Sequence, residues 1–137
     1  MKQVAMASFA VFVCWALLDF IIHGLLLAPS YAETTELWRP EAEMKLGLIY
    51  LVNLVSASFF VAVYALLVRP TQLSTGLKFG LLSGIGGGFS AGFGSYAVMP
   101  IPLGLAVGWS LEFLVEATLA GLIVGAMLTS AAPQERR

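Results

Sequence analysis

Long apolar stretches separated by short polar segments dominate the chain. Four stretches are each long enough to cross a hydrocarbon layer of about 30 Å, which takes roughly 20 residues of α-helix. They lie at residues 3–28, 44–68, 77–99 and 102–130. The connections between them are too short to fold independently. The pattern therefore predicts one all-α membrane domain over residues 1–137, an antiparallel bundle of four transmembrane helices.

Composition supports a membrane location. Of 137 residues, 59% are hydrophobic and only 11% are charged, whereas a soluble domain needs more charge on its surface. We therefore expect the lipid bilayer to cover most of the chain. No cluster of lysine and arginine is present that would neutralise a run of phosphates, so binding to nucleic acid is excluded.

The distribution of cationic residues predicts the orientation, because short loops rich in lysine and arginine tend to stay in the cytoplasm. Arg39 and Lys45 lie on one predicted side, beside four glutamates. The opposite side carries the larger set, which is Lys2, Arg69, Lys78, Arg136 and Arg137. Both termini are therefore expected in the cytoplasm, and the loop at 29–43 is expected to lie along the outer membrane surface.

Local signals predict where the helices begin. Pro40 followed by Glu41 and Glu43 is typical of a helix start, with proline in the first turn and carboxylates near the positive end of the dipole. Ser74 or Thr75 is expected to cap the third helix.

A glycine recurs at every fourth position of the third span, which extends the small-xxx-small pattern that lets membrane helices approach closely. The fourth span carries smaller rows at Gly104 and Gly108 and at Ala117, Gly121 and Gly125. We expect close packing between these two spans, although the run at 84–88 also allows a kink or a hinge in the third helix. The predicted packing positions are Gly76, Gly80, Gly84, Gly88, Gly92, Gly121 and Gly125.

Ionisable side chains inside the spans are the candidate functional residues, because a charge at mid-helix costs about 2.5 to 3.5 kcal/mol on insertion scales. Asp19 and His23 are four positions apart on the first span, and Glu112 and Glu116 are four apart on the fourth. Distances along the helices place Asp19, Asn53 and Glu112 at one depth. Ser90 of the third span is expected to complete this polar layer.

Three carboxylates in apolar surroundings exceed the charge that one imidazolium balances, so at least one, Glu116 first, is expected to be protonated or neutralised by a bound cation. Three interpretations remain open: structural hydrogen bonding within or between subunits, proton or ion handling, and metal or ligand binding. The metal candidates are Asp19, His23, Glu112 and Glu116, with oxygen and imidazole ligands that suit a first-row divalent ion.

Other cofactor chemistry lacks support in the sequence. The Glu-x-x-His spacing of di-iron proteins is missing, and a single histidine does not provide bis-histidine haem ligation. No positioned nucleophile or oxyanion hole is identifiable, so an enzymatic activity is not predicted.

The segments His23-Gly24-Leu25-Leu26-Leu27-Ala28-Pro29-Ser30-Tyr31 and Leu37-Trp38-Arg39-Pro40 resemble parts of small four-helix membrane proteins of bacteria. The resemblance covers about the first half of the chain and brings no site residues. It implies a location in the bacterial inner membrane.

Two functions are compatible with these features. The preferred one is a small structural or accessory subunit of a bacterial membrane complex. The alternative is an autonomous bundle, as a single chain or a homo-oligomer, that binds or conducts a proton, a metal ion or a small ligand through the Asp, His and Glu layer.

Overall fold

The computed structural model describes residues 1–129 and is all-helical over them, with no strand. Its long helices are α1 (Lys2–Ile21), α3 (Leu46–Leu67), α4 (Leu73–Val98) and α5 (Leu103–Met127). Short helical turns connect α1 to α3, namely η1 (Ile22–Leu26), α2 (Ala28–Ala32), η2 (Thr35–Leu37) and η3 (Glu41–Glu43). The four long helices fall within or close to the four predicted segments.

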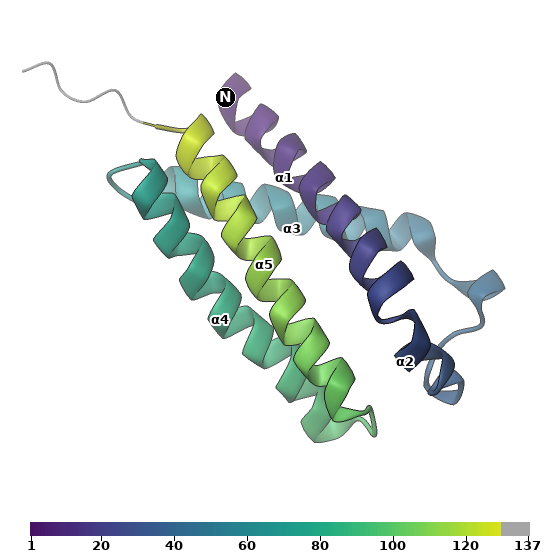
Figure 1. Ribbon diagram of the computed structural model, residues 1–137. Helices are drawn as coiled ribbons and strands as arrows, with labels where there is room; N and C mark the ends of the chain where they lie inside the picture. The colour runs from purple at the N-terminus through teal and green to yellow at the C-terminus, as the bar shows by residue number, and fades with distance from the viewer. Residues whose placement is uncertain (130–137) are drawn as a thin grey trace, which may run out of the picture.

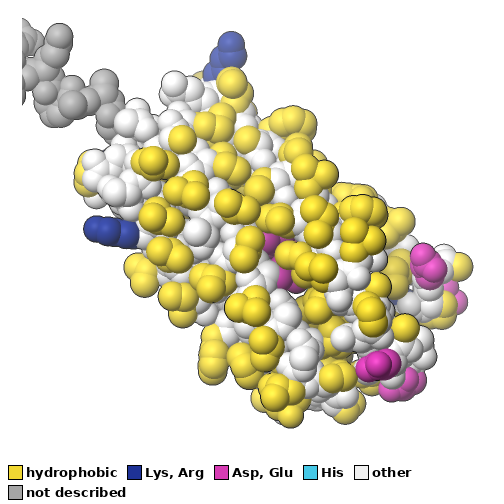
Figure 2. Space-filling model, viewed as in Figure 1, with side chains coloured by type: hydrophobic (Ala, Val, Ile, Leu, Met, Phe, Trp, Pro, Cys, Tyr) yellow, Lys and Arg dark blue, Asp and Glu magenta, His cyan; other side chains and the backbone are white. Residues whose placement is uncertain are grey.

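Three helical segments are long and apolar enough to cross a membrane: Lys2–Leu26, Leu46–Leu67 and Leu103–Met127. Helix α4 is as long, but glycine and serine replace many of its large apolar side chains and lower its hydropathy. Hydrophobic side chains are spread over the visible face between its charged ends (Figure 2), and many large hydrophobic side chains are exposed. The outside of the molecule is thus apolar, as its core is.

Helices α4 and α5 form an antiparallel hairpin (Figure 1). All five glycines of the predicted ladder in α4 are buried, and every one of them faces the backbone of α5. A methyl group added at Gly80 would meet the carbonyl oxygen of Ala117, and one added at Gly121 would meet that of Gly76. The absence of a side chain at these glycines therefore lets the two backbones touch.

The smaller glycine row at the start of α5 does not take part in this contact. Gly108 faces the side chain of Leu27, and a methyl group at Gly104 would meet open space. Of the two predicted rows in the fourth span, the one formed by Ala117, Gly121 and Gly125 contacts the α4 ladder.

Helix α1 packs on α5, and α3 crosses obliquely behind both (Figure 1). A buried cluster joins these three helices near the start of α1 and the end of α3, and it contains Ala7, Val11, Ala57, Val61, Tyr64, Ala120 and Val124. The first half of α3 diverges from this cluster, so that large side chains such as Leu48, Ile49 and Val52 are exposed. The divergence leaves a cleft between α3 and the other two helices.

The predicted helix starts need correction at two places. Pro40 opens only the short 3₁₀ turn η3, after which Met44 is extended and α3 begins at Leu46. Helix α4 begins at Leu73, with Gln72 as its N-cap, so Ser74 and Thr75 lie in its first turn and cap nothing.

The kink that the glycine run at 84–88 allows is not present in the third span, and a distortion that was not predicted follows α1. Helix α4 runs unbroken through its glycine run, because α5 packs along one side of it and holds its backbone. The helical distortion instead follows α1, where η1 is a π-helix closed by a hydrogen bond from Leu27 N–H to the carbonyl of Ile22.

Candidate functional site

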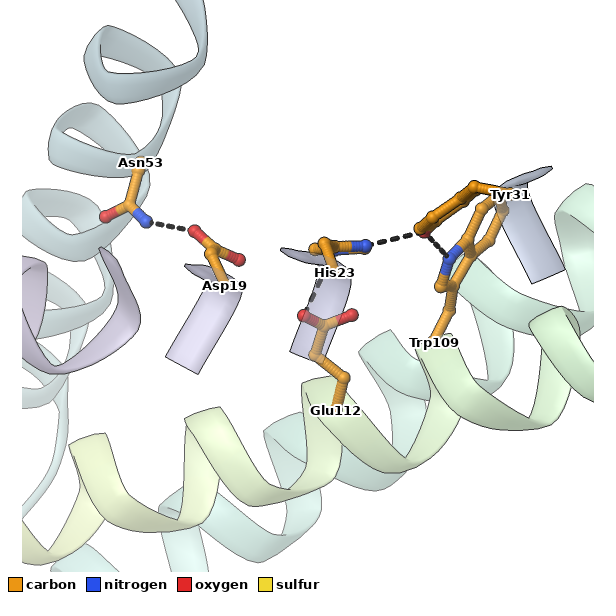
Figure 3. Close-up of polar contacts among 6 residues, drawn as sticks. All are labelled: Asp19, His23, Tyr31, Asn53, Trp109 and Glu112. Carbon is orange, nitrogen blue, oxygen red and sulfur yellow. Dashed lines mark hydrogen bonds and ion pairs between the residues drawn. The ribbon is translucent and has the colours of Figure 1, made fainter. Parts of the chain in front are cut away.

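Helices α1 and α5 bring the predicted polar pairs together. Asp19 lies in the last turn of α1, and His23 lies in η1 one turn further on. The extra residue in a π-helical turn rotates the side chains that follow it, and such turns occur frequently at functional sites. Both side chains lie beside α5, which carries Glu112 (Figure 3).

The central contact joins His23 and Glu112. Nε2 of His23 lies 3.0 Å from Oε1 of Glu112, with the histidine side chain 41% exposed and the glutamate 7% exposed. The distance is that of a salt bridge, but Oε1 has no aligned hydrogen-bond donor among the described residues. A nearly buried carboxylate is thus held against an imidazole with one of its oxygens unsatisfied.

Tyr31 and Trp109 fix the opposite edge of the imidazole (Figure 3). Trp109 Nε1–H donates to the Tyr31 hydroxyl oxygen at 2.7 Å, and this hydroxyl lies 2.5 Å from Nδ1 of His23. Because a hydroxyl both donates and accepts, Tyr31 satisfies Nδ1 whether or not that nitrogen carries a proton. It therefore leaves Nε2 free to act as a donor toward Glu112 or as a ligand.

Asp19 is oriented from α3. Nδ2 of Asn53 donates to Oδ2 of Asp19 at 2.7 Å, and Oδ1 of Asn53 has no hydrogen-bond partner among the described residues. Three helices thus supply the polar layer. The expected fourth member, Ser90, is exposed, because α4 packs on α5 and has no extensive contact with α1.

Glu116 lies one turn beyond Glu112 on α5 and stands apart from this network. Its backbone carbonyl accepts a hydrogen bond of 2.9 Å from Nε1–H of Trp15, while its side-chain Oε1 has no partner among the described residues. Of the five predicted site residues, Asp19, His23, Asn53 and Glu112 are therefore linked or adjacent, and Glu116 is separate.

Sequence reasoning missed the contribution of Tyr31 and Trp109. Tyr31 belongs to the loop at 29–43, for which the sequence indicated only a position along the membrane surface, and this connection between α1 and α3 folds over the start of α5. There Trp38 packs edge-on against both Tyr31 and Trp109, with ring centroids 5.2 and 6.1 Å apart. The available signal was the position of Trp109, three residues before Glu112 and hence on nearly the same face of α5.

The three acid and imidazole groups form a potential metal site. One ligand atom from each of Asp19, His23 and Glu112 lies within 4.8 Å of the others. Two carboxylates and one imidazole suit manganese, iron or zinc better than they suit a soft ion such as Cu(I). Glu116 does not belong to this set.

Replacing Tyr31 with phenylalanine tests its role beside His23. Burial, reinforced by the nearby Glu112 carboxylate and opposed by the Trp109 hydrogen bond, raises the pKa of Tyr31 from 10.0 to about 12. Because the pKa of Tyr31 is higher in the folded protein than in the unfolded chain, its contribution to stability is fully present below pH 10. This contribution is lost as the pH rises toward 12. The melting temperature of the wild type should therefore fall more steeply between pH 10 and pH 12 than that of Tyr31→Phe.

The same variant should be less stable at neutral pH by about 1 to 3 kcal/mol, because Trp109 Nε1 and His23 Nδ1 lose their partner. Equal stability of the two proteins at pH 7, together with parallel pH profiles, would contradict the described network.

No protein-family model, curated protein or solved structure matches this chain.

Proposed function

We propose that this chain is a multi-pass protein of the bacterial inner membrane that binds a first-row divalent metal ion through Asp19, His23 and Glu112. Three apolar helical segments of sufficient length and an apolar outer surface support insertion into a bilayer. The observation that carries the metal proposal is the buried Glu112 carboxylate, whose Oε1 lies 3.0 Å from Nε2 of His23 and receives no aligned hydrogen bond from the described residues.

The separation of charge supports the orientation with cytoplasmic termini. Lys2, Arg69 and Lys78 belong to the end of the molecule where α1 and α4 begin, and the acidic connection at 29–43 lies at the opposite end (Figure 2). The positive-inside rule assigns the first of these ends to the cytoplasm. Arg136 and Arg137, which were expected on the same side, lie outside the described residues.

The spacing of the ligand atoms supports metal binding. Two ligands bound at right angles to a first-row metal, each about 2.1 Å away, are themselves about 3.0 Å apart. Nε2 of His23 and Oε1 of Glu112 have this separation, 3.0 Å. The ligand atoms of all three residues lie within 4.8 Å of one another, so Asp19 is close enough to join the other two by an adjustment of its side chain.

The hydrogen bonds around the three residues also support metal binding, because metal ligands in proteins are themselves oriented by neighbouring groups. Asn53 holds the carboxylate of Asp19, and Tyr31 holds the imidazole of His23. A divalent cation would also balance the charge of two carboxylates in apolar surroundings, which is costly without a counter-ion.

Native mass spectrometry after gentle extraction in detergent tests both predicted functions. We expect one chain or a homo-oligomer that carries one divalent ion per chain. After treatment with a chelator, added Co²⁺ should restore this stoichiometry and show the visible absorption of a protein-bound ion. A stable complex with other polypeptides, free of metal and unable to take up Co²⁺, would refute the metal proposal and favour an accessory subunit.

A further inference from the structure

A second candidate binding region lies beside the proposed metal site, in the cleft that opens where α3 diverges. The cleft has a volume of about 440 Å³, within the range of sites for small organic molecules. Apolar and aromatic side chains form most of its wall, including Trp15, Val52 and Phe113. Asp19, Asn53, Ser56 and Glu116 contribute polar groups.

The polar groups of the cleft are predominantly acceptors. Oδ1 of Asn53 and Oε1 of Glu116 are both buried without a hydrogen-bond partner among the described residues. The described residues that line the cleft include two carboxylic acids and no lysine, arginine or histidine. Buried acceptors of this kind are normally satisfied, so the missing donors are those that a ligand would bring.

We infer that this cleft binds an amphiphilic organic cation, a molecule with an alkyl or aromatic body and an ammonium group. The ammonium group provides N–H donors for Glu116 and Asn53 together with a positive charge for Glu116, the acid of the cleft that lies outside the proposed metal set. The body fits the apolar wall, and the indole of Trp15 and the ring of Phe113 attract a cation placed over their faces. A lipid acyl chain would fill the same volume but offers neither donors nor charge.

The inference goes beyond metal binding and is separable from it, because each site has one acid that the other lacks. Glu112 belongs to the proposed metal set and does not line the cleft, whereas Glu116 lines the cleft and lies outside that set. Asp19 borders both and is therefore unsuitable for telling them apart.

Equilibrium dialysis of the full chain in detergent, saturated with Co²⁺, provides the test. Phenylbutylamine is compared with phenylbutanol, which has the same body and no charge. The wild type should prefer the amine by at least about tenfold, the factor expected for one charge-assisted hydrogen bond. Glu116→Gln should reduce this preference to less than about threefold while Co²⁺ binding is retained, and Glu43→Gln, at an exposed position outside the spans, should change neither.

A second variant keeps the test valid if Glu116→Gln folds poorly. Leu48 is exposed and lines the cleft from α3, so Leu48→Trp should fill the space and weaken binding of both compounds. Equal binding of amine and alcohol by the wild type, or an amine preference that survives in Glu116→Gln, would overturn the inference; the first of these results indicates a groove for lipid chains.

Discussion

Substituting Glu112 with glutamine is expected to weaken Co²⁺ binding by at least about 100-fold, more than is usual when only the partners of metal ligands are changed. The amide has nearly the same shape as the carboxylate but lacks its charge and is a poor ligand. The measurement is a Co²⁺ titration of the chelator-treated protein, followed by visible absorption. Loss of binding should occur with the helical circular dichroism unchanged.

The stability of the same variant distinguishes a ligand from a structural contact. If the Glu112 carboxylate only paired with His23, its replacement would change the stability of the protein modestly. The wild-type protein would then bind no Co²⁺ at this position. The matched control is Glu43→Gln, which removes an exposed carboxylate from η3 and should leave the titration unchanged. Unaltered Co²⁺ affinity in Glu112→Gln would rule out Glu112 as a ligand.

A methyl group at Gly80 is expected to destabilise the protein by about 1 to 3 kcal/mol, the usual effect of overpacking, although alanine favours the helix. The added carbon would meet the carbonyl oxygen of Ala117 and Cα of Thr118. Both are backbone atoms, which have no rotamer with which to move aside. Helices α4 and α5 must separate, and contacts along the hairpin weaken together.

The matched control lies in the same helix. Gly86 and Gly94 belong to α4, and a methyl group added to either one has no atom within 4 Å. Gly86→Ala should therefore be neutral or stabilising by up to about 1 kcal/mol. Thermal unfolding of the three proteins in one detergent measures the difference, and equal melting temperatures for Gly80→Ala and Gly86→Ala would show that the glycine ladder is not a close contact.

Helix α5 links this packing to the candidate site. The backbone of residues 106–125 is pressed against the glycine face of α4, as the contacts of Gly88 with Ser110 and of Gly84 with Leu114 illustrate. Glu112 lies between these two contact positions and points toward α1. The hairpin is thus a firm support for the acid that faces His23, so loosening the ladder should also weaken Co²⁺ binding at the proposed metal site.

Much of the local structure was predictable because it depends on neighbours along the chain. Runs of apolar residues indicated where the helices lie, and the four-residue period of the α4 glycines identified the face on which backbones touch. The same period placed Asp19 with His23, and Glu112 with Glu116. The predicted ends were less reliable at Pro40 and Ser74, because a turn or cap signal competes with contacts that a distant segment makes.

The pairings across helices were not predictable for a physical reason. These helices are apolar nearly all around, so the pattern contains no amphipathic stripe that fixes their rotation. The depth of each residue along its helix predicted that the polar residues, Ser90 included, share one level. It did not predict which of them pair, namely Asn53 with Asp19 and Glu112 with His23. Tyr31 belongs to a loop that was expected along the membrane surface, and nothing in the sequence indicated its contacts with His23 and Trp109.

The sequence by itself determined the apolar helical segments, the glycine face and the two pairs of ionisable residues, since each follows from helical periodicity and hydropathy. Only the tertiary structure decided the π-turn after α1, the Tyr31 and Trp109 contacts to His23, the separation of Glu116 from the metal set and the cleft beside α3. These features depend on how the helices rotate and cross, which packing between distant segments sets.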